Sequence, residues 1–164
     1  MNFVAIDVET ANHDMASICQ IGMVKYTDGK LADEWESYIN PEVCFESIIK
    51  RVHGISEETV ASSPTLPDVL PEIVEFIGDF VLVCHTHFDR VSLCKAVDRY
   101  QKIMPPNLWL DSAKVTRRTW EQFSYRGYGL ENVCNFLEYD YQAHDALEDA
   151  KAAAQVLLAA EVTG

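Results

Sequence analysis

The sequence lacks paired cysteines and long apolar runs. Its cysteines, Cys19, Cys44, Cys84, Cys94 and Cys134, are odd in number and include no Cys-x-x-Cys pair. That pattern argues against a disulfide framework and a zinc knuckle, so we expect free thiols in a reducing compartment. No apolar run is long enough to cross a membrane, and no basic segment followed by an apolar one opens the chain. These absences predict a cytoplasmic protein with no membrane partner.

Basic residues are also scarce. The chain has 13 lysines and arginines against 26 aspartates and glutamates, a net charge of −13. Such an excess of negative charge argues against a polyanionic partner such as nucleic acid. Eight of the 13 basic residues nevertheless fall between Arg90 and Arg126. They form either a locally basic face or ordinary solvated helix faces, so charge alone leaves a nucleic-acid partner open.

The pattern of apolar residues predicts a single α/β domain spanning residues 1–164. A hydrophobic fraction of 48% in 164 residues suits one domain with a sizeable core. The expected strands cover residues 3–10, 17–26, 31–39, 80–85 and 107–111. A short helix is expected after a cap at Ser56, and a longer one in the segment framed by Pro64 and Gly78. Further helices are expected over residues 89–102, 112–123, 130–137 and 144–160. Ser112 is the expected cap of the helix over 112–123. A meander of strands followed by alternating helices and strands predicts a mixed sheet flanked by helices.

Two acids stand at the end of the first expected strand. Phe3 to Ile6 suit a buried strand, and Asp7 and Glu9 follow two residues apart. Because side chains on a strand alternate between faces, Asp7 and Glu9 point the same way, with Phe3 and Ala5. Like charges on one face of a core strand repel each other, and burial strengthens the repulsion. A bound cation would compensate for this repulsion, and a solvated strand end is the alternative.

The last expected helix presents another acid to the sheet. On a helical wheel, Ala146, Ala150 and Ala153 form one narrow face of small residues that allows close approach to the sheet. Asp149 lies about 60° from Ala146, whereas Glu148 points to solvent. We therefore expect Asp149 to face the strand that carries Asp7 and Glu9.

A fourth acid and a histidine complete a possible metal site. Asp89 follows a buried strand, at the strand ends where open α/β sheets place their sites; the alternative role is a helix N-cap. Ligands that are all oxygen suit Mg²⁺ or Mn²⁺ rather than zinc. Two such ions about 4 Å apart catalyse phosphoryl displacement. His144 is then a candidate general base, or else an ordinary surface or capping residue.

Taken together, these residues resemble the DEDDh 3′–5′ exonuclease family of the ribonuclease H-like superfamily, which includes the epsilon-like proofreading exonucleases of DNA polymerase III. The matching motifs are Ile6-Asp7-x-Glu9-Thr10, His85-x-x-Phe88-Asp89 and His144-x-Ala146-x-x-Asp149. The Gln20-Ile21-Gly22 and Val52-His53-Gly54-Ile55-Ser56 segments also look like family features. The resemblance implies a ribonuclease H-like mixed five-stranded sheet flanked by helices.

The resemblance also implies a role for each matching residue. Asp7, Glu9, Asp89 and Asp149 would hold two ions of Mg²⁺ or Mn²⁺, and His144 would be the general base. The implied reaction is metal-dependent hydrolysis of single-stranded DNA from its 3′ end, releasing nucleoside 5′-monophosphates. The implied substrate contacts are the backbone of Thr10 near the terminal sugar, and His53 and Ile55 around the terminal base.

One motif departs from the family pattern. The family has His-Asn-x-x-Phe-Asp, whereas here Thr86 takes the place of the asparagine and the spacing is one residue shorter. This departure affects the expected geometry and substrate contacts of that turn only. The alternatives are an exoribonuclease or oligoribonuclease, whose 2′-OH contacts the sequence does not reveal, and a catalytically silent nucleic-acid- or protein-binding module. We expect a stand-alone enzyme or a fragment of a longer one; a polymerase partner and a homodimer both remain open.

Overall fold

A five-stranded mixed sheet organises the chain. The computed structural model describes residues 1–163. The strands are β1 (Phe3–Thr10), β2 (Ile18–Thr27), β3 (Lys30–Tyr38), β4 (Val81–Cys84) and β5 (Trp109–Asp111), in the order β3-β2-β1-β4-β5. The first three form an antiparallel meander, and β4 and β5 run parallel to β1. The predicted mixed sheet of five strands is confirmed.

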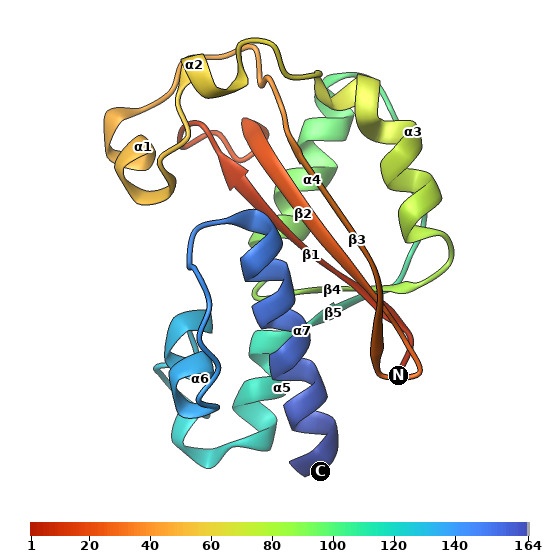
Figure 1. The fold of residues 1–164 in the computed structure, drawn as a ribbon, viewed down its shortest axis with the longest axis vertical. Coiled ribbons are helices and arrows are strands. Elements are labelled where there is room, and N and C mark those ends of the chain that lie inside the picture. Colours follow the sequence, from red (N-terminus) through yellow and green to blue (C-terminus); the bar gives the residue numbers. More distant parts are fainter. Residues whose placement is uncertain (164) are drawn as a thin grey trace.

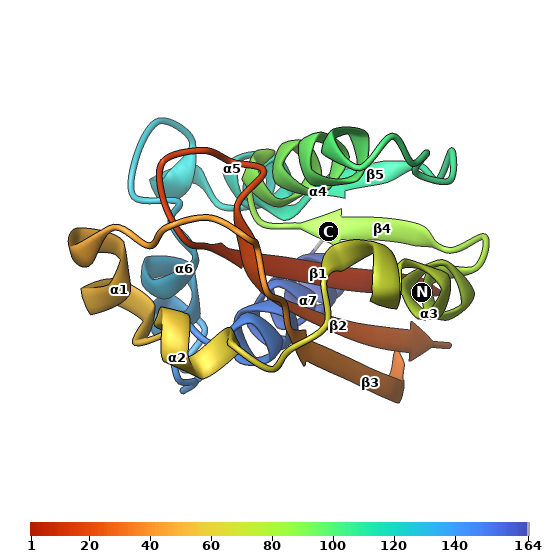
Figure 2. The same cartoon turned by 90° about the horizontal axis from the view of Figure 1, so that it is seen from above.

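Helices cover both faces of this sheet (Figures 1 and 2). On one face lie α3 (Leu66–Ile77) and α4 (Phe88–Arg99). On the other lie α5 (Ser112–Thr119), α6 (Leu130–Phe136) and α7 (Ala146–Thr163), with a 3₁₀ turn at Glu121–Phe123 after α5. Two short helices, α1 (Ser47–His53) and α2 (Glu57–Val60), lie beyond the end of β1 that carries Thr10.

The alternation of side chains along β1 divides the core into two layers. Val4, Ile6 and Val8 pack in one cluster with residues of α3 and α4. Phe3 and Ala5 pack in a second cluster with residues of α7. Because alternate residues share a face, Asp7 and Glu9 continue the face that α7 covers, as their spacing predicts.

The first turn of α7 lies directly on β2. Gly22 pairs with Asp7 across the β1–β2 ladder, and a Cβ at Gly22 would lie 2.3 Å from the backbone nitrogen of Leu147. Two residues away on the same face, Gln20 accepts a hydrogen bond through Oε1 from the backbone N–H of Ala146, at 3.1 Å. The absence of a side chain at Gly22 therefore brings the start of α7 beside Asp7.

The structure corrects the predicted beginnings of two helices. The last helix begins at Ala146 rather than at His144, because Asp145 Oδ1 accepts the backbone N–H of Glu148 at 3.1 Å, the bonding of an N-cap. Similarly, α5 is capped by Asp111 and not by Ser112: the Asp111 carboxylate accepts the backbone N–H groups of the second and third residues of that helix. Residues 112–123 also divide into α5 and the 3₁₀ turn.

The segment between β3 and α3 is more regular than predicted. It contains α1, which spans only seven residues and buries none of them, so its few apolar residues, Ile48, Ile49 and Val52, give too short a pattern to predict a helix. The predicted cap at Ser56 is confirmed: its side chain accepts the backbone N–H of Thr59, at 3.4 Å. Gly54, between the two helices, has φ 76°, a left-handed conformation that ends α1.

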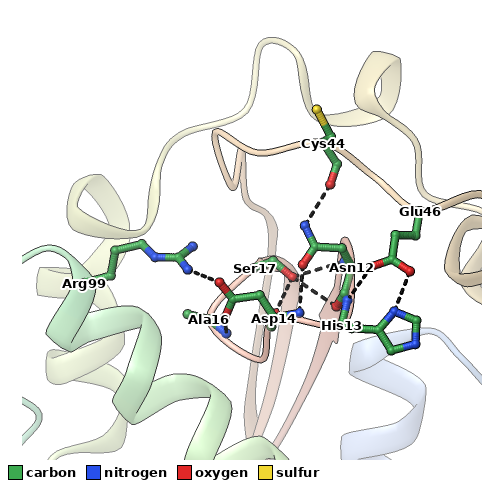
Figure 3. Close-up of polar contacts among 8 residues, drawn as sticks. All are labelled: Asn12, His13, Asp14, Ala16, Ser17, Cys44, Glu46 and Arg99. Carbon is green, nitrogen blue, oxygen red and sulfur yellow. Dashed lines mark hydrogen bonds and ion pairs between the residues drawn. The ribbon is translucent and has the colours of Figure 1, made fainter.

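Polar contacts fix the loop that joins β1 to β2 (Figure 3). Asn12 donates through Nδ2 to the carbonyl of Cys44 at 2.8 Å, and His13 contacts the carboxylate of Glu46. On the other side, Arg99 at the end of α4 forms an ion pair with Asp14. The loop that follows Glu9 and Thr10 is therefore held between α4 and the segment that leads into α1.

All five cysteines are free, as predicted. Within residues 1–163, no helix combines the length and the apolar character that a membrane span requires.

The contact at Gly22 yields a test of the fold. We expect Gly22→Ala to lower the free energy of unfolding by about 1–3 kcal/mol or more, because the new methyl group overlaps the α7 backbone and cannot turn away. Denaturant unfolding measures this change. Gly129→Ala is the matched control, since a Cβ there meets no atom within 4 Å. Equal stabilities of the two variants would contradict the close packing of α7 on β2.

Candidate active site

The predicted acids and histidine meet at one end of the sheet. A cavity of about 490 Å³ opens where β1 and β4 end. Asp7 and Glu9 reach it from β1, Asp89 from α4, Asp149 from α7 and His144 from the turn before α7. Side chains from three distant parts of the sequence thus share one cavity, although their individual roles stay predictions.

Asp89 is fixed by the backbone of β1. It is the second residue of α4 and is only 3% exposed. Its Oδ1 accepts the backbone N–H of Val8 at 3.0 Å. Pairing between β1 and β4 extends only to Ala5, so Val8 lacks a strand partner on that side and the aspartate takes its place. Asp89 therefore bonds to β1 and is not the N-cap of α4, the alternative role that its position in the sequence allowed. Its Oδ2 takes no part in this hydrogen bond.

Asp149 holds the turn that carries His144. It is 7% exposed, and its Oδ2 accepts the backbone N–H of His144 at 2.9 Å. His144 itself is exposed at the cavity and has φ 66°, a left-handed conformation that is uncommon for a non-glycine residue. The hydrogen bond from its own N–H to Asp149 supports this conformation. One ligand atom from each of Glu9, His144 and Asp149 lies within 4.8 Å of the other two.

Burial and mutual repulsion raise the pKa of Asp7, Glu9, Asp89 and Asp149. Burial is the largest cause for Asp7, whose pKa is raised well above its usual value, with the charges of Asp89 and Asp149 adding to it. Burial likewise raises the pKa of Glu9 to about 8, of Asp89 to about 7 and of Asp149 to about 6. Among residues 1–163, the cavity lining includes no lysine or arginine to offset these charges.

The donor atoms suit a hard divalent cation. Asp7, Glu9, Asp89 and Asp149 offer carboxylate oxygens from three elements into one cavity, and no cysteine lines it. Mg²⁺ and Mn²⁺ prefer oxygen ligands of this kind. A cation would also remove the repulsion that raises these pKa values. The residues present therefore fit the metal site that the sequence predicts.

The three predicted substrate contacts lie together beside the cavity rather than in its lining. His53 hydrogen-bonds through Nε2 to the carbonyl oxygen of Thr10 at 2.9 Å, and its Nδ1 accepts the backbone N–H of Ile55 at 3.0 Å. Both ring nitrogens are thus engaged, and the imidazole is the neutral tautomer with its proton on Nε2. Burial lowers the pKa of His53, with the nearby charge of His144 adding to the effect.

Ile55 is more deeply placed than its predicted role suggests. It is 3% exposed and packs in a small buried cluster with Ala11, Cys19, Phe45 and Val60. A contact between Ile55 and a terminal base remains a prediction.

One wall of the cavity comes from residues without a sequence signal. Tyr141 and residues 129–132 line it opposite the sheet. Burial raises the pKa of the Tyr141 hydroxyl, with the charge of Asp149 adding to it. Only the glycines at 127 and 129 mark this region as a loop, so nothing in the sequence places it near β1.

His85 fixes this wall and the turn with the unusual threonine. The imidazole is buried between Ser112 Oγ, at 2.9 Å from Nδ1, and the carbonyl of Tyr128, at 2.7 Å from Nε2. Thr86 has φ 76° and donates its backbone N–H to Asp111 Oδ1 at 3.0 Å. The turn between β4 and α4 is therefore held by its own contacts, with threonine where the family has asparagine.

Known proteins show the same architecture over nearly the whole chain. The chain is 31% identical to a PolC-type DNA polymerase III from Caldanaerobacter subterraneus subsp. tengcongensis over 159 residues, which cover 95% of this chain but only 11% of that protein. It is 25% identical to the DNA polymerase III subunit epsilon of Aquifex aeolicus, covering 95% of this chain and 78% of that protein. The chain thus spans about a tenth of the length of its PolC-type relatives.

Solved nuclease structures share the fold. Exonuclease X in complex with 5′-overhanging duplex DNA superposes with a TM-score of 0.78 at 24% identity, over 99% of this chain and 92% of the other. The nuclease domain of 3′hExo, a DEDDh family member bound to rAMP, gives 0.80 at 18% identity with the same coverage. These structures confirm the ribonuclease H-like fold.

The characteristic pattern of the Exonuclease family matches residues 4–157, which include all four cavity acids and His144. The chain therefore belongs to the Exonuclease family.

Proposed function

We propose that residues 1–164 form a single exonuclease domain that hydrolyses single-stranded DNA from the 3′ end and releases nucleoside 5′-monophosphates. The observation that carries this proposal is the meeting of two buried carboxylates (Asp89 and Asp149), two partly buried ones (Asp7 and Glu9) and one exposed histidine in a single cavity with no lysine or arginine in its described lining. Such a cavity repels a phosphodiester unless cations occupy it, and with cations it attracts one.

The residues divide into metal ligands and a proton acceptor. Asp7, Glu9, Asp89 and Asp149 would hold two ions of Mg²⁺ or Mn²⁺. When bound, such ions polarise the scissile phosphate, lower the pKa of an attacking water and steady the leaving oxygen. His144 accepts the proton of that water, and its exposed position at the cavity leaves room for substrate.

Beside the cavity, Thr10 and His53 would position the terminal nucleotide. The carbonyl of Thr10 is already occupied by His53, which fixes the β1 end against the segment after α1. A fixed edge of this kind allows the terminal sugar and base to be held in one orientation while the phosphate lies over the acids.

We also propose that the substrate is DNA rather than RNA and that the partner protein is a polymerase. DNA is favoured because the relatives are DNA polymerase III proteins. RNA is the alternative, because a structural neighbour is bound to rAMP. A polymerase partner would suit those relatives, and a cytoplasmic location would suit free thiols.

The first test removes the central acid. Asp7→Asn should reduce release of nucleoside monophosphates from a 5′-labelled DNA oligonucleotide by more than about a hundredfold. Mutation of a residue that only hydrogen-bonds to a metal ligand lowers activity by up to about a hundredfold, and loss of a ligand itself should cost more. Asp140→Asn, an exposed acid outside the cavity lining, is the control and should be fully active. Full activity of Asp7→Asn would refute the metal-ligand role of Asp7. If the unmodified protein hydrolyses a matched RNA faster than the DNA, RNA is the preferred substrate.

The second test separates the base from the ligands. His144→Gln should lower kcat by about 10²–10⁴-fold, the usual contribution of a general base. It should leave Mn²⁺ binding, measured by calorimetry, close to that of the unmodified protein, because the carboxylates remain. A variant that loses Mn²⁺ binding together with activity would make His144 a ligand instead of a base.

The raised pKa values predict how the metal-free protein responds to pH. With folded-state pKa values near 7 for Asp89 and 8 for Glu9, the native state binds more protons than the unfolded chain, whose carboxyl pKa values are about 4. Stability therefore falls as pH rises through this window. In EDTA, we expect the Tm to fall by several degrees (about 2–4 °C per kcal/mol for a domain of this size) between pH 5 and pH 8.

Two comparisons assign that fall to the cavity. Asp7→Asn should show a shallower decline, because one repelling charge is gone. Added Mn²⁺ should raise the Tm more at pH 8 than at pH 5, because the carboxylates must be deprotonated to bind it. An unchanged slope in the variant would show that other groups cause the pH dependence.

A further inference from the structure

A second cavity lies at the edge of the sheet, away from the acids. It has a volume of about 200 Å³ and is lined by residues of α4, β5 and α5, among them His87, Arg90, Trp109, Asp111, Lys114 and Arg118. Here we call it the α4–α5 cleft. β5 is the last strand of the sheet, and α4 and α5 lie on opposite faces of it (Figure 1). The residues that line the cleft therefore come from both sides of the open edge of β5.

Three basic side chains that form no ion pair in the described part of the chain line the cleft. Arg90, Lys114 and Arg118 are exposed, and within residues 1–163 none of them forms an ion pair. The one acid present, Asp111, uses Oδ1 to accept the backbone N–H groups of Thr86, Ala113 and Lys114. In a protein with a net charge of −13, three cations converging on one concave surface form a localised site for an anion.

An aromatic surface lies among these cations. Trp109 is only partly buried and lines the cleft with its strand neighbour Leu110. Backbone phosphates with bases beside them match this combination, because cations bind the phosphates and an indole face stacks on a base of any sequence. A free inorganic anion would use the cations but not the indole.

The cleft and the catalytic cavity share one short segment. His85 and Thr86 line the catalytic cavity, and His87 lines the cleft. At the start of α4, Asp89 lies in the catalytic cavity and Arg90, the next residue, in the cleft. Successive residues of a helix point about 100° apart, so this single turn faces both sites.

We propose that the α4–α5 cleft binds the sugar-phosphate backbone of the nucleic acid at nucleotides remote from the 3′ end in the catalytic cavity. The inference rests on the proposed exonuclease function and adds to it a second contact on the substrate. The cleft contributes to affinity for long substrates and not to the chemical step. A short substrate that fills only the catalytic cavity does not reach it.

A triple variant, Arg90→Ala/Lys114→Ala/Arg118→Ala, tests the proposal. With 5′-labelled single strands of 20 nucleotides, we expect KM to rise on the order of tenfold with kcat unchanged. The slope of log Kd against log salt concentration, measured by fluorescence anisotropy in EDTA, should fall by about 2, since each lost phosphate contact on a single strand contributes about 0.7. A dinucleotide should be hydrolysed at the unmodified rate.

Two further variants sharpen the test. Lys30→Ala/Lys102→Ala removes exposed cations outside the cleft and should leave KM and the salt slope unchanged. Trp109→Leu should weaken binding of the long strand without changing the salt slope, because it removes stacking and no charge. Circular dichroism and the Tm establish that each variant is folded.

The outcomes distinguish this proposal from the proposed function. Unchanged KM and salt slope in the triple variant, or an equal loss in the Lys30/Lys102 control, would overturn the role of the cleft. An equal loss on the dinucleotide would also overturn it, by placing the effect at the chemical step. Absence of hydrolysis by the unmodified protein would refute the exonuclease proposal alone, because the anisotropy measurement needs no catalysis.

Discussion

The structure depends on how four mutually repelling carboxylates are kept in one cavity. Each acid brings a like charge into the same cavity, and burial raises the pKa of all of them. Two of the four are held by backbone N–H groups: Val8 donates to Asp89 and His144 to Asp149. These bonds engage one oxygen of each carboxylate. The remaining oxygens are left to face the cavity, so the fold supports the charges without neutralising them.

The order of the strands explains why the acids can meet. Because β1 lies between antiparallel β2 and parallel β4, its end that carries Asp7 and Glu9 adjoins both the turn into α4 and the start of α7. Parallel pairing with β4 brings in Asp89, and the glycine on β2 admits Asp149. The β1–β2 pairing of the meander thus admits Asp149, and the parallel β1–β4 pairing brings in Asp89.

Sequence patterns predict the parts of the site that belong to regular elements. The period of two along β1 puts Asp7 and Glu9 on one face, and the helical period puts Asp149 toward the sheet. The beginning of α7 was placed two residues too early, because the cap at Asp145 and the contact from Gln20 are tertiary features. Tyr141 and the helix α1 are not predicted either: Tyr141 lies in a loop without a periodic pattern, and Ile48, Ile49 and Val52 of α1 are too few apolar residues to define a helix. The acids alone define a metal site, but the shape of the space around it depends on segments that only the fold brings close.

The distribution of charge resolves the conflict between an acidic protein and a polyanionic substrate. Some acids lie in the catalytic cavity, where cations would reverse their effect. Others lie on the exposed edge strand β3, whose Asp33, Glu34 and Glu36 discourage pairing with another sheet edge. Free positive charge gathers at the α4–α5 cleft, one helical turn from Asp89. A negatively charged strand is therefore repelled by much of the surface and attracted where the two sites adjoin. This charge distribution orients the substrate toward the two sites more than it raises the overall affinity. It also makes the affinity for substrate decrease with salt concentration.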